Sequence, residues 1–181
     1  MKRKLFALIL VLAMVFALAA GARAEEGDPS FVVGSATVDP GEEFTVPVSV
    51  SNNIGVISVV LEITYSEDLT LVKAEDKQLF SDGILSPADS DPLIASWIMA
   101  NRTEDHCGDG EILLLTFRMA EDAEPGSKHT VKVEYDPENV FDYKMDNMPF
   151  ETVDGEITVK GTPSRETTAA TKATTAATTA E

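Results

Sequence analysis

Apolar and polar residues alternate along several short segments of this chain. The clearest alternation runs from residue 111 to residue 119, where Leu113, Leu115, Phe117 and Met119 fall on one side. A period of two residues is typical of a β-strand that buries one face and exposes the other. Between residues 25 and 161 no segment carries the i, i+3, i+4 apolar stripe of an amphipathic helix. The pattern therefore predicts an all-β domain.

Turn signals separate these alternating segments. Asp39-Pro40-Gly41 and Glu124-Pro125-Gly126 each combine a proline, which sets one dihedral angle, with a glycine, which tolerates the next. Eight or nine short strands joined by such turns favour an antiparallel β-sandwich. Pro47 lacks a ladder donor, which favours an edge position or a bulge for its strand. Strands are expected at 31–38, 43–50, 56–65, 69–74, 93–100, 111–119, 128–135 and 150–160, with loops at 79–92 and 101–110.

The two ends of the chain differ in composition from the predicted domain at residues 25–160. Residues 1–24 begin with Lys2, Arg3 and Lys4, continue with an apolar run, and end on Ala22-Arg23-Ala24. This order of charged, apolar and small residues is typical of a secretory signal peptide, so we expect the chain to be secreted. Residues 161–181 are almost entirely Thr and Ala and predict a low-complexity linker without a core of its own.

The predicted mature chain is strongly acidic. The full sequence has 14 basic and 31 acidic residues, and four of the basic ones precede residue 25, so 10 − 31 leaves a net charge of −21. Binding to nucleic acid or to anionic lipid depends on Lys and Arg. The charge balance therefore argues against a nucleic-acid partner, and the predicted signal cleavage leaves no membrane span.

Residues suited to catalysis or metal binding are sparse. Cys107 is the single cysteine, so an intrachain disulfide is impossible. His106 and His129 have no zinc-ligand spacing, and no base is placed to activate a nucleophile. We therefore predict no catalytic residues, no bound metal and no cofactor in this chain.

Three predicted strands carry apolar residues at positions that should face outward. An outward sheet face normally carries polar side chains. If these strands are neighbours, their apolar side chains form one patch of the kind that binds proteins. The alternative is that a loop or a terminal strand covers them. The apolar outward residues are Val60, Ile98, Ile112 and Leu114, interleaved with Ser58, Glu62, Ser96 and Thr116.

Carbohydrate binding and adhesion are the alternative functions. A sugar-binding surface generally needs exposed aromatic rings, and this chain has one tryptophan and three tyrosines. Trp97 shares its strand face with Ala95 and Met99, which predicts burial. Contact with polysaccharide therefore stays open as a second hypothesis.

Several motifs occur together in an order that resembles a known family. A turn at Asp39-Pro40-Gly41 precedes the strand Thr45-Val46-Pro47-Val48, and Asn53-Ile54-Gly55-Val56 opens the next strand. Later, Asp109-Gly110 opens a strand that ends before the turn Ala123-Glu124-Pro125-Gly126. In this series, residues 31–160 resemble a cohesin domain of a cellulosomal scaffoldin.

The resemblance implies a fold and a function. Cohesins are nine-stranded jelly-roll sandwiches that hold dockerin modules of secreted enzymes or scaffold proteins in extracellular polysaccharide-degrading complexes. Calcium is expected on the dockerin. The family's binding sheet holds its third, fifth, sixth and eighth strands, which we expect at 56–65, 93–100, 111–119 and 128–135.

This assignment and the outward pattern select overlapping residues. Ser58 and Val60 stand where well-known cohesins often have Asn and Asp, which indicates a more apolar contact. The expected partner-binding residues are Ser58, Val60, Glu62, Ser96, Ile98, Ala100, Ile112, Leu114 and Thr116.

Overall fold

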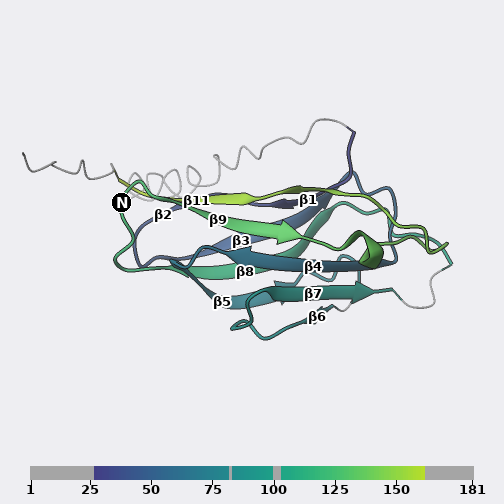
Figure 1. The fold of residues 1–181 in the computed structure, drawn as a ribbon, viewed down its shortest axis with the longest axis horizontal. Helices are drawn as coiled ribbons and strands as arrows, with labels where there is room; N and C mark the ends of the chain where they lie inside the picture. The colour runs from purple at the N-terminus through teal and green to yellow at the C-terminus, as the bar shows by residue number, and fades with distance from the viewer. Residues whose placement is uncertain (1–26, 82, 100–102, 162–181) are drawn as a thin grey trace, which may run out of the picture.

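The computed structural model describes residues 27–81, 83–99 and 103–161 (Figure 1). The predicted signal peptide, nearly all of the predicted linker and the candidate Ala100 lie outside the described residues. No helix among the described residues is both long enough and apolar enough to cross a membrane.

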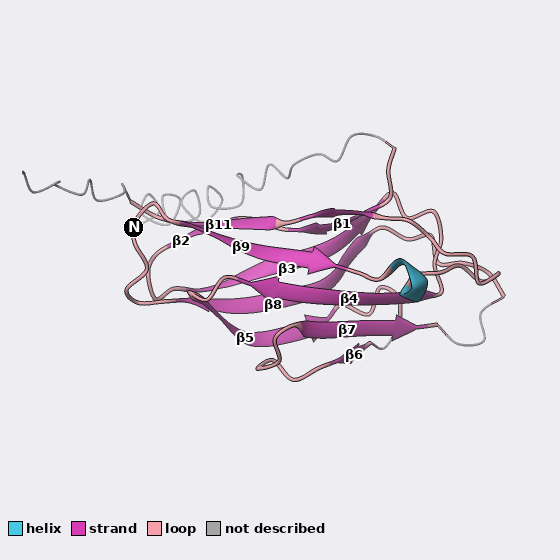
Figure 2. Ribbon diagram, in the orientation of Figure 1, coloured by secondary structure: helices cyan, strands magenta, loops and turns pink. Residues whose placement is uncertain are grey.

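The described residues form two packed β-sheets, as the alternating pattern predicts (Figure 2). Sheet A has the order β10 (Glu151–Val153), β1 (Ser30–Val33), β3 (Glu43–Ser51), β8 (Gly110–Met119) and β5 (Leu69–Asp76). Sheet B has the order β2 (Ala36–Val38), β11 (Gly155–Val159), β9 (Lys128–Glu134), β4 (Ser58–Tyr65), β7 (Leu93–Ile98) and β6 (Ile84–Leu85). A short 3-10 helix, η1 (Pro137–Asn139), follows β9. The prediction of a β-sandwich is confirmed, with eleven short strands in the described part of the chain instead of nine.

Both terminal strands cross from one sheet to the other at the same place. The expected strand at 31–38 is two strands, β1 in sheet A and β2 in sheet B, and the segment 150–160 divides likewise into β10 and β11. β1 pairs with β10 and β2 pairs with β11, both in parallel, so the sandwich is not wholly antiparallel. Gly34 and Gly155 lie at the crossing. A Cβ on Gly155 would collide with the carbonyl oxygen of Gly34, and one on Gly34 would press on Pro47.

The core lies between the sheets and matches the inward sets that the alternation predicts. Val59, Leu61 and Ile63 of β4 are fully buried, and so are Ala95 and Trp97 of β7. Burying large aliphatic or aromatic side chains contributes about 1.5–3 kcal/mol each, so this interior supplies the main driving force for folding. The prediction that Trp97 is a core residue is confirmed.

A carboxylate fastens the chain beyond β5 to the core and to sheet B. Asp76 accepts hydrogen bonds from Trp97 Nε1 at 3.1 Å and from the Gly83 amide at 2.7 Å. Phe80, in the same segment, packs edge-on against Trp97. The next residues form β6, a strand of only two residues inside the predicted loop 79–92. Because β6 pairs with β7, Asp76 helps to position the edge of sheet B.

The strand that contains Pro47 is not at an edge. β3 lies between β1 and β8 inside sheet A, and its register with β8 shifts between Val48 and Ser49. The extra residue at this shift is Ile112 of β8, so the strand of Pro47 neither lies at an edge nor carries the bulge, and both predicted alternatives are wrong. Pro47 is tolerated because β1 leaves the sheet opposite it, where the Gly34 amide donates to the Pro47 carbonyl at 2.8 Å.

Candidate protein-binding surface

The outer face of sheet B carries exposed apolar side chains on neighbouring strands. Ser96 of β7 pairs with Val60 of β4 on one side and with Ile84 of β6 on the other. Ile94 and Ile98 lie two residues either side of Ser96 on the same face, because side chains alternate along a strand. Ile84 is 75% exposed and Ile98 is 64% exposed. We call Val60, Ile84, Ile94 and Ile98 the aliphatic cluster.

Three of the predicted binding residues belong to the opposite sheet. β8 pairs with β3 and β5 in sheet A and does not neighbour β4 or β7, so the expectation of one patch across all three strands is wrong. Leu114 and Thr116 lie half-buried on the outer face of sheet A. Strand pairing between distant segments depends on topology, which alternation along one segment does not reveal.

Ile112 is also not exposed. The register between β3 and β8 skips it, because Val48 pairs with Leu113 and Ser49 pairs with Glu111, so the alternation along β8 is interrupted at this residue. Ile112 is 1% exposed and belongs to the core cluster. The outward position that alternation assigns to Ile112 is therefore wrong.

The remaining predicted residues lie on sheet B. Val60 and Ser96 are half-buried, and Glu62 is exposed on the same face. Ser58 is 3% exposed because the chain after η1 runs beside it, and its hydroxyl donates to the Asn139 carbonyl at 3.2 Å. Ile84 and Ile94 belong to the same surface but were not among the predicted residues. Ile84 was missed because β6 is too short to show alternation, whereas Ile94 continues the outward set of β7 and could have been found from its alternation.

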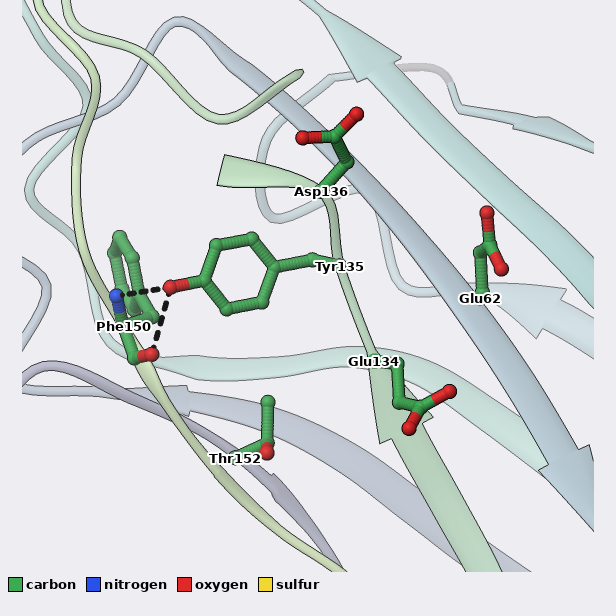
Figure 3. Close-up of a pocket in the computed structure, with 6 residues that line it drawn as sticks. All are labelled: Glu62, Glu134, Tyr135, Asp136, Phe150 and Thr152. Atoms are coloured by element: carbon green, nitrogen blue, oxygen red, sulfur yellow. Dashed lines mark hydrogen bonds between the residues drawn. The ribbon is translucent and has the colours of Figure 1, made fainter. Parts of the chain in front are cut away.

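A polar hollow borders the aliphatic cluster on the β9 side (Figure 3). It has a volume of about 430 Å³ and is lined by Glu62, Glu134, Tyr135, Asp136, Phe150 and Thr152. The Tyr135 hydroxyl closes one wall by donating to the Phe150 carbonyl and accepting from the Phe150 amide, both at 2.7 Å. The hollow is therefore open, rigid on its Tyr135 side and lined by three carboxyl groups.

Two of these carboxylates lie opposite each other, and neither forms an ion pair with a basic side chain of the described residues. Glu62 and Glu134 are directly opposite in the register between β4 and β9. Among the described residues neither has an ion-pair or hydrogen-bond partner. Like charges placed directly opposite each other in a sheet are destabilising. This end of the surface therefore favours a positively charged group on whatever binds there.

Ser127, His129 and Asp68 are arranged like a catalytic triad, but their contacts connect two turns and do not line a cleft in the described part of the chain. His129 Nε2 lies 2.7 Å from Ser127 Oγ, and His129 Nδ1 lies 3.3 Å from Asp68 Oδ2, which is the order of a Ser-His-Asp triad. His129 is only 6% exposed, and it lines neither the polar hollow nor a second hollow of about 240 Å³ beside Tyr65 and Thr130. The contacts join the turn before β9 to the turn before β5. The sequence hid them because Asp68 lies about 60 residues from the other two.

The loop carboxylates are likewise engaged by the backbone. Asp142 Oδ1 accepts hydrogen bonds from the Lys144 amide at 2.8 Å and from the Asp146 amide at 2.9 Å. Within the described ranges no three His, Cys, Asp or Glu residues are grouped as a metal site would require.

The sequence profile of the Cohesin domain family matches residues 29–159. No curated protein matches the chain significantly. Among solved structures, the chain is similar to a cohesin in a type I cohesin–dockerin complex from Clostridium thermocellum, with 17% identity over 74% of this chain and 99% of that one and a TM-score of 0.63. It is also similar to a type III cohesin from a cell-surface anchoring scaffoldin of Ruminococcus flavefaciens, with 19% identity, coverages of 79% and 98%, and a TM-score of 0.62.

A third similar structure comes from outside the cellulosome. It is a non-cellulosomal cohesin from the archaeon Archaeoglobus fulgidus, with 17% identity, coverages of 75% and 93%, and a TM-score of 0.61. Cohesin domains are non-catalytic protein-binding modules, in agreement with the prediction that this chain is not an enzyme. The profile match covers every strand of the two sheets, and on that ground the chain belongs to the cohesin domain family.

Proposed function

We propose that this chain captures dockerin modules on the outer face of sheet B, at the aliphatic cluster. The observation that carries the proposal is the exposure of Ile84 and Ile98 on one open sheet face of a cohesin domain. Solved structures similar to this chain include cohesins in complex with dockerins. The chain would act as a docking module in an extracellular complex that degrades polysaccharide.

The aliphatic cluster has the composition of a binding centre with a polar surround. Hot spots of protein interfaces lie in central residues that lose water on binding, and rim charges contribute less. Burying one exposed isoleucine can supply about 1.5–3 kcal/mol. Ile84 and Ile98 would provide most of the affinity, while Glu62 and Glu134 would govern the rate of association and the choice of partner.

Secretion and the calcium requirement form part of the same proposal. The N-terminal pattern of basic, apolar and small residues supports export from the cell. Calcium would reside on the dockerin and not on this chain. Binding would then depend on calcium although the cohesin itself holds none.

Carbohydrate binding finds less support. Trp97 is fully buried, and Tyr135 is tied to Phe150 by two hydrogen bonds. Of the described Trp and Tyr side chains, Tyr143 alone is among the exposed large apolar residues. One exposed ring does not make the flat platform on which a sugar chain stacks.

Calorimetric titration of the purified chain with calcium-loaded dockerins, repeated in chelator, tests the proposal. We expect binding in calcium, no binding in chelator, and at least a roughly 100-fold loss, or about 2.8 kcal/mol, for Ile98→Asp. Val72→Asp is the matched control, because Val72 is an exposed aliphatic residue of β5 in sheet A. Equal losses in the two variants, or no binding by the wild type to any dockerin, would contradict the proposal.

A further inference from the structure

The exposed apolar residues of this domain are not confined to the sheet. The large apolar side chains with the greatest exposure are Ile54, Val72, Ile84, Ile98, Tyr143 and Met145. Val72 belongs to sheet A and two of the others to the aliphatic cluster. Ile54, Tyr143 and Met145 lie in two loops, 52–57 and 140–148.

These two loops meet at one end of the sandwich. The Tyr143 amide donates to Asp105 Oδ1 at 2.7 Å, and Gly55 packs against the same Asp105 side chain. We call this the loop end. In Figure 1 it is the end toward which the arrows of β7 and β9 point.

The loop end adjoins the aliphatic cluster. Ile98 is the last residue of β7 and pairs with Ser58, the first residue of β4. On its other side Ser58 forms a bridge with Phe141, from which the loop 140–148 begins. The backbone pairings therefore place the loop that carries Tyr143 and Met145 one strand away from Ile98.

The turn at 142–146 holds an apolar side chain outward at a conformational cost. Met145 has a φ of 70° and is 65% exposed. A left-handed conformation is unusual for a residue other than Gly, Asn or Asp, and such strain concentrates at functional positions. Asp142 fixes the turn through its bonds to the amides of Lys144 and Asp146. The loop therefore presents Met145 in a preorganised way.

The sheet face alone is small for a stable interface. Its outward side chains across β9, β4, β7 and β6 number about ten, whereas a standard interface uses roughly 20–30 residues on each side. A partner that docks there has to extend over one end of the sandwich. The opposite end is formed by the turns before β5 and β7, and none of the exposed large apolar residues in the described part of the chain lies there.

That opposite end is acidic. Glu67, Asp68, Asp89 and Asp91 are exposed in its turns. Partial burial raises the pKa of Tyr65 above its ordinary value of 10.0, and the charges of Asp91 and Asp89 add to this effect. An apolar partner surface gains nothing from this end, so the two ends of sheet B are unequal.

We propose that the dockerin footprint runs from the aliphatic cluster onto the loop end, with Tyr143, Met145 and Ile54 as partner contacts. This inference rests on the proposed function and adds a direction to it. The partner has to present apolar side chains beyond those that cover β6 and β7. The loop 140–148 then becomes a part of the surface that selects between dockerins.

Met145→Gly gives the sharpest test, because glycine adopts a φ of 70° without strain. We expect the thermal midpoint to stay equal or rise while the affinity for a calcium-loaded dockerin falls about threefold to tenfold. Tyr143→Ala should cost roughly tenfold. Glu67→Ala, at the acidic end, is the matched control and should leave affinity within about twofold.

The outcomes separate this inference from the function beneath it. Wild-type binding that Ile98→Asp removes and that Met145→Gly and Tyr143→Ala leave unchanged would overturn the footprint and leave the docking face intact. A larger loss in Glu67→Ala than in the two loop variants would reverse the direction of the footprint. Failure of the wild-type chain to bind any dockerin would overturn both proposals together.

Discussion

The outer faces of the two sheets are built from the same alternating pattern but end in different states. On sheet A, Leu114 and Thr116 are half-buried, and charges are paired, with Arg118 to Glu43 at 2.9 Å and Lys73 to Glu75 at 2.8 Å. On the β4, β7 and β6 part of sheet B, aliphatic side chains are open to water. Where they border β9, two carboxylates face each other unpaired.

This difference shows what alternation can and cannot reveal. Alternation identifies the side chains that point away from the core, but it does not say whether another segment lies over them. A satisfied face and an unsatisfied face therefore look alike in the sequence. Only the unsatisfied one gains free energy from a partner.

The largest expected effect is on the stability of the whole domain, and it would disrupt both sheets. In Gly155→Val the new side chain would collide with the backbone at Gly34, where both terminal strands change sheets. We expect a loss of more than about 4 kcal/mol in the free energy of unfolding, or no folded protein. Circular dichroism during thermal unfolding measures this. A variant that melts like the wild type would show that the crossing is not as close as described.

Matched substitutions on the two sheets separate the faces. Ile94→Asp, beside Ser96 on sheet B, should lower dockerin affinity by roughly 30-fold or more, because a charge replaces a buried apolar contact. Leu114→Asp, at a half-buried position on sheet A, should change affinity by less than about threefold. Titration calorimetry on variants that remain folded provides the measurement. The reverse ranking would move the interface to sheet A.

A smaller effect should reach sheet B through its support. Asp76→Ala leaves Trp97 Nε1 and the Gly83 amide without their acceptor, which should cost about 1–3 kcal/mol of stability. Because the segment leads into β6, affinity should fall as well. Urea denaturation measures the stability, and Glu75→Ala, one residue away on an exposed ion pair, is the control. Equal stability losses in the two variants would show that the hydrogen bonds of Asp76 to Trp97 and Gly83 do not stabilise this segment.

The smallest effect concerns the facing carboxylates. Glu134→Gln removes one of two like charges opposite each other and should raise the free energy of unfolding by about 0.2–1 kcal/mol. It should also slow association with a basic dockerin surface at low salt, and the difference should vanish at high salt. Stopped-flow measurements at two ionic strengths check this. An association rate that is the same for the wild type and Glu134→Gln, and the same at low and high salt, would exclude electrostatic steering.

Much of the fold follows from the sequence, since local alternation and turn chemistry determine each strand. The inward sets of β4 and β7 and the burial of Trp97 were all predictable in this way. Sheet membership was not, because β8 pairs with β3 and β5 through contacts between distant segments. β6 was not predicted because a strand of two residues shows no alternation. The division of residues 31–38 between two sheets was not predicted because it occurs where Gly34 contacts the distant Gly155.

The candidate surface could be predicted only in part for the same reason. Val60, Glu62, Ser96 and Ile98 were recognised from their outward positions and do share one face. The same rule selected Ile112, which is buried in the core where the register of β8 shifts. It also selected Ser58, beside which the chain after η1 runs. Register shifts and crossing segments depend on contacts with distant parts of the chain, and this information lies outside the strand itself.

Methyl NMR on the isoleucines tests the central claim most directly, because these residues report on both sheets at once. Ile84, Ile94 and Ile98 lie on the outer face of sheet B, and Ile112 lies in β8 of sheet A. On addition of a calcium-loaded dockerin, we predict large shifts or broadening of the first three methyl signals and an unchanged Ile112 signal. A shifted Ile112 with Ile84 and Ile98 unchanged would contradict docking on sheet B.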